Sequence, residues 1–102
     1  AKMRGTILWE NPNPTKALAA QDIILSADDY DYYEVFFRNT NIKKMSSIKA
    51  IKGYDAVLFI LGSYRRDLVY KSDTVLSVEN AIVNNQINNE SCVPIKIIGY
   101  KS

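Results

Sequence analysis

Seven tyrosines in 102 residues are the side chains best suited to recognition chemistry in this sequence. An aromatic ring can stack on the apolar face of a sugar, and its phenol group adds hydrogen bonds at a low cost in conformational entropy. Tyrosine is also a favoured strand residue, so any single tyrosine is more often a cross-strand packing partner than a ligand contact. Tyrosines beside turn sequences are the better ligand candidates. The candidate binding residues are Tyr30, Asp31, Tyr32, Tyr54, Tyr64 and Arg66.

The sequence offers few side chains that are suited to catalysis. The sequence contains no histidine, so Ser-His-Asp catalysis, Cys-His catalysis and histidine metal ligation are all missing a required group. Paired carboxylates can hydrolyse a glycosidic bond, and oxygen-rich loops can bind Ca²⁺. The acidic residues close enough together for either role are Asp28, Asp29, Asp31 and Glu34. Their clustering favours a solvated turn in which aspartates accept hydrogen bonds from local backbone N–H groups, so we expect no enzyme activity, no metal and no cofactor.

Trp9, Cys92 and the basic stretch 43–52 each have a functional and a structural interpretation. Trp9 could be a sugar platform, but its place at a strand end favours closing one end of the core. Cys92 is the single cysteine, which excludes an internal disulfide and predicts a small buried hydrophobe. The net charge is +2, and the basic stretch has no dense aromatic interleaving, so we expect a solvated surface and no nucleic-acid partner.

The length of the chain predicts one domain with a real hydrophobic core. The longest apolar run, residues 56–61, is far shorter than the roughly 18 residues that span a bilayer, so we expect no membrane insertion. The first five residues lead into a strand-like run and not into a signal peptide. We therefore expect residues 1–5 to be a linker from an upstream region and residues 6–102 to be a single domain.

Short apolar segments recur between turn signals along the chain, a pattern typical of an antiparallel all-β domain. The expected strands are residues 6–9, 23–25, 32–38, 46–52, 55–61, 64–71, 74–78 and 94–100, with a weaker one at 81–83. Seven or eight strands at this spacing predict a β-sandwich or a jelly roll. Alternation within the third strand places Tyr33, Val35 and Phe37 in the core and the residues between them on the opposite face.

Three segments carry narrower expectations. Residues 55–61 are apolar on both faces, which predicts a central strand covered by two layers, or by one layer and a neighbouring subunit. Residues 42–52 have apolar residues three apart, as in a turn-rich helix, but a strand over 46–52 is favoured because 53–55 then forms a hairpin connection. The asparagine-rich segment 84–91 is expected to be a polar loop.

The two ends of the chain carry a family resemblance. They read Thr6-Ile-Leu-Trp-Glu-Asn-Pro-Asn-Pro-Thr15, followed by Ala19-Ala-Gln-Asp-Ile-Ile-Leu25, and Cys92-Val-Pro-Ile-Lys-Ile-Ile-Gly-Tyr-Lys101. In order and spacing, these segments resemble the C-terminal domain of tail-fibre and minor structural proteins from phages of Gram-positive bacteria. The similarity runs from about Thr6 to Lys101. The sequence departs from the family near Leu18, where an aromatic residue is common.

The resemblance implies a small β-sandwich at the tip of a virion appendage, assembled as a homotrimer within a longer fibre protein. Its implied role is non-enzymatic adhesion, outside the cell, to a glycan of the host cell surface. Two alternatives stay open: a structural domain that caps a trimer or decorates a phage head, and a carbohydrate-binding module or adhesin domain. The neighbouring sequence in the full polypeptide would separate a fibre from a binding module.

Overall fold

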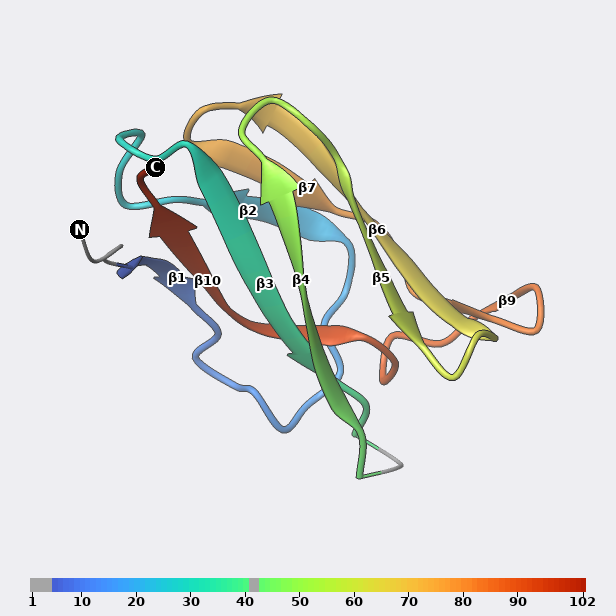
Figure 1. Ribbon diagram of the computed structural model, residues 1–102. Coiled ribbons are helices and arrows are strands. Elements are labelled where there is room, and N and C mark those ends of the chain that lie inside the picture. The colour runs from blue at the N-terminus through green and yellow to red at the C-terminus, as the bar shows by residue number, and fades with distance from the viewer. Residues whose placement is uncertain (1–4, 41–42) are drawn as a thin grey trace.

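The computed structural model describes residues 5–40 and 43–102, and these form an all-β sandwich (Figure 1). Within the described residues there are ten strands: β1 (Gly5–Glu10), β2 (Gln21–Ile24), β3 (Tyr32–Arg38), β4 (Met45–Ile51), β5 (Ala56–Ile60), β6 (Tyr64–Ser72), β7 (Val75–Val78), β8 (Ile82–Val83), β9 (Gln86–Ile87) and β10 (Val93–Tyr100). Every pair of neighbouring strands is antiparallel. The predicted fold class is therefore confirmed. In the part of the chain that the structure describes, no helix is long and apolar enough to cross a membrane.

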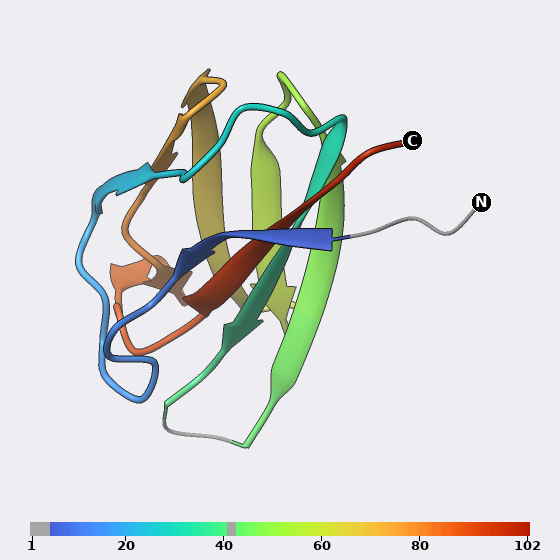
Figure 2. The same ribbon diagram turned by 90° about the vertical axis from the view of Figure 1, so that its left-hand side faces the viewer.

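The strands form two sheets that lie face to face as two layers (Figure 2). Sheet A has the order β1-β10-β3-β4. Sheet B has the order β2-β7-β6-β8-β9, and β5 pairs with β6. The last strand, β10, lies between β1 and β3. The first strand therefore forms one edge of sheet A, and the last strand lies in its interior.

The core lies between the layers and follows the predicted alternation. Tyr33, Val35 and Phe37 are fully buried on the inner face of β3. From the other elements they meet Leu58, Leu68, Leu76 and Ile97. Each such side chain contributes roughly 2 kcal/mol by leaving water. Trp9 packs against this core and Cys92 is fully buried, as expected for both.

Position 99 in β10 requires glycine for a steric reason. A Cβ atom on Gly99 would stand 2.7 Å from Cδ1 of Leu8 and 2.9 Å from Cβ of Tyr30, which no ordinary side chain tolerates. The glycine lets β10 pass closely over the core at this point. Its neighbour Tyr100 then projects from the opposite side of sheet A, because side chains alternate along a strand.

Strand β4 settles the ambiguity of residues 42–52, since Met45–Ile51 form a strand of sheet A. Ile42, part of the helical alternative, lies outside the described residues. The predicted hairpin at 53–55 is wrong: β4 pairs with β3 whereas β5 pairs with β6, so this turn carries the chain from sheet A to sheet B. Gly53 turns the chain there with φ of 97°.

Two other expectations also need correction. Strand β5 is not buried on both faces within one chain: Ala56, Leu58 and Ile60 are buried, but Phe59 is 48% exposed and β6 is the one strand that pairs with it among the described residues. The segment 84–91 is not a plain loop, because it contains β9, paired with β8. Asn84 and Asn85 both have positive φ, the geometry of a type I′ turn, which asparagine tolerates better than most residues.

Candidate functional site

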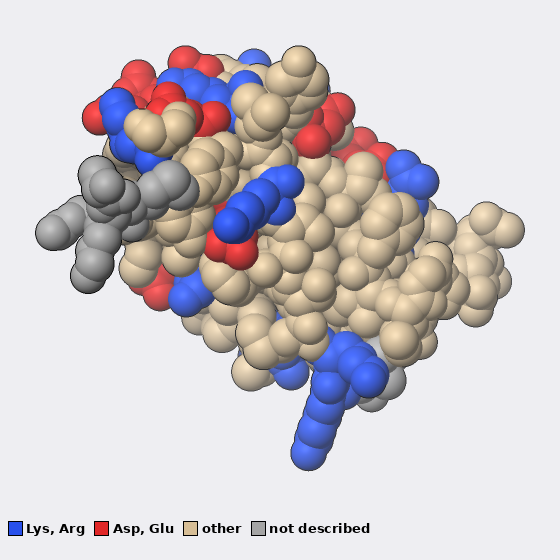
Figure 3. All heavy atoms as spheres, in the orientation of Figure 1, with Lys and Arg blue, Asp and Glu red and all other residues tan. Residues whose placement is uncertain are grey.

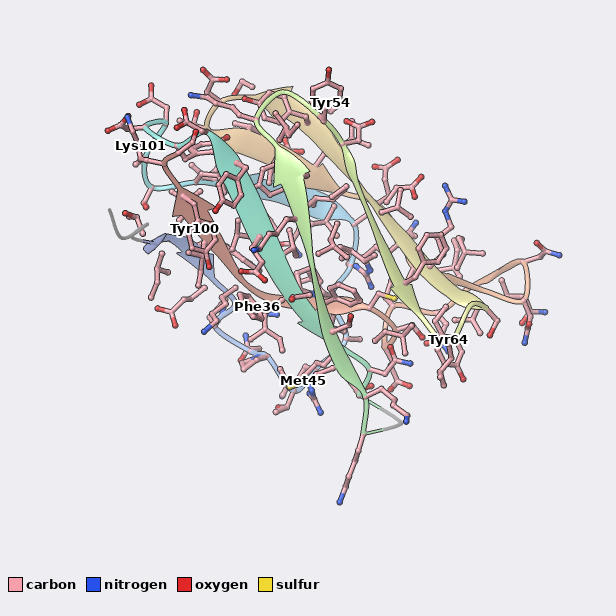
Figure 4. The ribbon with its side chains drawn as sticks, viewed as in Figure 1. Phe36, Met45, Tyr54, Tyr64, Tyr100 and Lys101 are labelled. Atoms are coloured by element: carbon pink, nitrogen blue, oxygen red, sulfur yellow. The ribbon has the colours of Figure 1, made fainter. Side chains whose placement is uncertain are left out.

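The outer side of sheet A presents a continuous band of side chains, which we call the sheet A face. In register across β10, β3 and β4 it contains three rows: Tyr100, Tyr32 and Ile51; then Ile98, Glu34 and Lys49; then Lys96, Phe36 and Ser47. Tyr100 and Phe36 both lie over this sheet (Figure 4). Alternation explains the composition, because the residues between these on β3 are the buried core residues.

Two stacked rings lie in the first row of the sheet A face. The rings of Tyr32 and Tyr100 lie 5.0 Å apart between centroids, with an angle of 18° between their planes. The Lys49 ammonium lies 5.9 Å from each centroid. In the row next to that of Lys49, the Lys96 ammonium lies 4.9 Å from the Phe36 centroid. The face therefore combines aromatic rings with cations placed close to them.

Glu34, on the same face of β3, holds the neighbouring side chains in place through both of its carboxylate oxygens. Its Oε1 accepts a hydrogen bond of 2.8 Å from the Tyr100 hydroxyl, and its Oε2 accepts one of 3.0 Å from the Ser47 hydroxyl. The first bond raises the pKa of Tyr100, so the phenol stays protonated and its ring stays oriented. Both carboxylate oxygens are thus occupied by neutral donors on the neighbouring strands.

An open cavity of about 450 Å³ borders Tyr32 of the stacked pair, and its lining residues are Asp31, Tyr32, Lys49, Ala50, Ile51 and Ser102. Asp31 Oδ2 accepts hydrogen bonds from Ser102, 2.7 Å from its backbone N and 2.9 Å from its hydroxyl. These bonds lower the pKa of Asp31 and hold its carboxylate in the charged form at the rim. The cavity thus has one aromatic wall, one apolar wall and charged groups at its edge.

The predicted site residues divide between this cavity and other places. Asp31 and Tyr32 line the cavity together. Tyr30 lies beneath the surface, 2% exposed, and its hydroxyl donates a 2.8 Å hydrogen bond to the Asp73 carbonyl. Its ring meets Tyr33 edge-on at 6.4 Å. Tyr30 is therefore a support for the start of β3 and not a surface contact.

Tyr54 and Tyr64 lie at opposite ends of β5 (Figure 4). Tyr54 is 66% exposed at the turn between the sheets, where its carbonyl accepts a 2.7 Å hydrogen bond from the Tyr33 hydroxyl. Tyr64 is half-buried against the core at the start of β6. The structure thus does not bring these two tyrosines into one site with Tyr32.

Arg66 is fully buried, so the prediction of a ligand contact does not fit its position. Its guanidinium donates hydrogen bonds to the carbonyls of Leu18 at 2.8 Å, Asn89 at 3.1 Å and Ser91 at 3.2 Å. Burial lowers its pKa to about 10, which still leaves the group charged at neutral pH. Arg66 therefore fastens the irregular segments 11–20 and 88–91 to β6.

Of the acidic cluster, Asp28, Asp29 and Asp31 lie in the expected turn, whereas Glu34 lies within β3; the carboxylates of Asp29, Asp31 and Glu34 bond to groups far along the chain and not to the local backbone. Asp29 Oδ1 lies 2.7 Å from the Lys101 ammonium, and Asp31 bonds to Ser102. Among residues 5–40 and 43–102, no group of three or more acidic or cysteine side chains is arranged to hold a metal ion. The cluster ties the C-terminal residues to the start of β3.

A second aromatic group lies on the outer side of sheet B, which we call the sheet B face. The Arg65 guanidinium lies 5.7 Å from the Phe59 centroid, beside a hollow of about 320 Å³ that both residues line with Ile82 and Asn84. Arg65 is paired, because its Nε lies 3.0 Å from Asp67 Oδ1. Its charge is therefore already compensated.

Several site residues were not among the sequence candidates: Lys49, Ile51, Tyr100 and Ser102. Alternation alone could place Tyr32 and Glu34 on one face. Which residues of distant strands lie beside them depends on the pairing of β3 with β10 and β4, and no local pattern determines that register. Comparisons with protein-family models, with curated proteins and with solved structures find no match to this chain.

Proposed function

We propose that this chain is a non-enzymatic recognition domain that binds a glycan of the host cell surface through the sheet A face, as the tip domain of a phage fibre. The observation that carries the proposal is the stacked pair of Tyr32 and Tyr100 beside an open cavity of about 450 Å³. Sugar rings have apolar faces that pack on aromatic rings, and their hydroxyl groups need polar partners at the edges.

The polar groups around the cavity suit that role. Asp31 and the Ser102 hydroxyl stand at its rim, and both are held in place by their mutual hydrogen bonds. A fixed acceptor loses little entropy when a sugar hydroxyl binds to it. Tyr32, Lys49 and Ile51 lie on the paired strands β3 and β4, which adds to this preorganisation, and Asp31 immediately precedes β3.

The resemblance of the two terminal segments to phage fibre domains supports the biological setting. On this basis the proposed setting is a virion appendage that acts outside the cell, with the domain inside a longer fibre protein that forms a homotrimer. A cellular adhesin or a carbohydrate-binding module would use the same face for the same chemistry, and the neighbouring domains of the full polypeptide would distinguish these settings.

A structural role in the virion is the second candidate, and exposed apolar residues on sheet B favour it. Phe59 is 48% exposed, Leu61 is 65% exposed and Ile87 is 63% exposed. Residues of this kind suit a contact between subunits. In such a trimer-capping or head-decorating domain, the sheet B face would be covered and no glycan would be needed.

The experiment is a binding screen against purified bacterial cell-wall glycans and intact cells, with the oligomeric state of the same sample measured by light scattering. We expect selective glycan binding that falls more than about tenfold in Tyr32→Ala and in Tyr100→Ala, as for an aromatic hot spot. Phe59→Ala, which removes an aromatic ring from the sheet B face, is the matched control and should leave binding unchanged. Absence of binding by a confirmed trimer would favour the structural role.

A further inference from the structure

We propose that the glycan bound at the sheet A face carries an anionic substituent, a carboxylate or a phosphate, and that Lys49 binds it. This inference rests on the proposed function. Its starting point is a difference among the basic side chains of the described residues: some are engaged by acceptors within the protein, whereas others, Lys49 among them, are not.

Three cations on or near the two faces show the engaged situation. Lys52 lies 2.5 Å from the Asp28 carbonyl and 3.5 Å from Asp73 Oδ2. Lys101 is paired with Asp29, and Arg65 is paired with Asp67. Each of these charges is compensated before any ligand arrives.

Lys49 is different. Its ammonium contacts the rings of Tyr32 and Tyr100, but no carboxylate oxygen lies within 4.0 Å of it in the described part of the chain. The obvious partner would be Glu34, which stands directly opposite it on β3. Both oxygens of Glu34 are instead engaged by the hydroxyls of Tyr100 and Ser47. Lys49 therefore keeps its charge available at the edge of the cavity.

The position of Lys49 suits a ligand that is part sugar and part anion. The ammonium is equidistant from the two stacked rings and lines the same cavity as the apolar side chain of Ile51. A sugar ring seated on the tyrosines would bring a charged substituent within reach of the flexible lysine side chain. A charge-assisted hydrogen bond to an ammonium is about twice as strong as one between neutral groups.

A second unpaired cation extends the site along the sheet. Lys96 lies over Phe36 and likewise has no carboxylate within 4.0 Å among the described residues. Phe36 is four residues from Tyr32 on β3, a separation of about 13 Å along a strand. Two aromatic positions with a cation at each, spaced in this way, suit an oligosaccharide better than a single sugar.

The charges around the site predict that selectivity for an anionic ligand comes from individual contacts and not from a strong electrostatic field over the surface. The side of the molecule seen in Figure 3 is largely uncharged, with acidic and basic side chains gathered mainly toward its margins. Glu34 and Asp31 offset Lys49 and Lys96 in the total charge of the site. Long-range attraction of a polyanion is therefore weak, and we expect only a modest dependence of affinity on salt.

The test uses matched ligands with and without the anionic group, titrated into the ¹⁵N-labelled protein and followed by amide chemical shifts. One pair is an oligogalacturonide and its fully methyl-esterified form, and the other is a mannose oligosaccharide with and without a 6-phosphate. We expect the charged member of at least one pair to bind at Tyr32 and Tyr100 about tenfold more tightly than the neutral member. The two pairs distinguish a carboxylate from a phosphate as the substituent.

Lys49→Met should abolish this preference, because it should weaken binding of the charged ligand about tenfold more than binding of the neutral one. Lys71→Met makes the same change in net charge at an exposed position on β6 and should have no effect. If charged and neutral ligands bind equally well at the sheet A face and Lys49→Met changes neither affinity, the proposal of an anionic ligand is contradicted. The proposed function would still stand. Absence of shifts at the sheet A face with every ligand would overturn both.

Discussion

The two outer faces of the sandwich carry the same pair of side-chain types in different electrostatic settings. On the sheet A face, Lys49 lies 5.9 Å from the rings of Tyr32 and Tyr100 and has no carboxylate partner in the described structure. On the sheet B face, Arg65 lies 5.7 Å from the ring of Phe59 and is paired with Asp67. An aromatic ring with a cation nearby is therefore not by itself a sign of an anion site.

The difference comes from where the neighbouring carboxylate directs its oxygens. Glu34 is the cross-strand neighbour of Lys49, yet tyrosine and serine hydroxyls occupy it. Asp67 is two residues from Arg65 on β6, on the same side of the strand, and binds it directly. The hydrogen bonds made by the neighbouring acid therefore decide which cation stays available for a ligand.

The largest effect is expected at Arg66, which belongs to the core and to neither face. Replacing it by methionine would remove the hydrogen bonds that Arg66 donates to the buried Ser91 carbonyl and the part-buried Leu18 carbonyl. A buried polar group without a partner costs about 1–3 kcal/mol, so we expect Arg66→Met to lower the free energy of unfolding by about 3 kcal/mol. Urea denaturation at pH 7 measures this change.

Arg65→Met is the matched control on the same strand, because exposed ion pairs contribute little. We expect its free energy of unfolding to stay within about 0.5 kcal/mol of the unaltered protein. Equal stability of the two variants would contradict the structural role of Arg66 and would return it to the candidate ligand residues.

A smaller effect is expected from Asp67→Asn, which would make the sheet B face resemble the sheet A face. The substitution keeps the shape of the side chain but removes the charge that compensates Arg65. We expect a gain of a few-fold in affinity for phosphate-bearing sugars at Phe59 and Arg65, detectable as new amide shifts there. No gain would mean that an unpaired cation beside an aromatic ring is insufficient, and that the cavity next to Tyr32 is also required.

The sequence predicted most of the fold, because alternation and turn residues are local signals. The core residues of β3 and the ambiguous strand β4 followed from them. The errors arose where the answer depends on long-range pairing. Residues 53–55 look the same whether they join paired strands or cross between sheets, and apolar residues on both faces of β5 do not reveal that Phe59 is exposed.

The candidate site was predictable in part for the same reason. Tyr32 and Asp31 stand next to each other in the chain and were identified together. Lys49 and Tyr100 come from strands that flank β3 on either side, and only the register of the sheet brings them to Tyr32. Arg66 was misassigned because a buried arginine bonded to carbonyls leaves no mark in the sequence that separates it from its exposed neighbour Arg65.

The most direct test of the account is to map where a bound glycan contacts the protein. The ¹⁵N-labelled domain would be titrated with the best ligand from the cell-wall screen, and the shifted amides would be placed on the structure. The account predicts that the shifts centre on Tyr32, Lys49 and Tyr100 and leave Phe59 and Arg65 unperturbed. Shifts centred on Phe59 and Arg65 would contradict it and would assign recognition to the sheet B face.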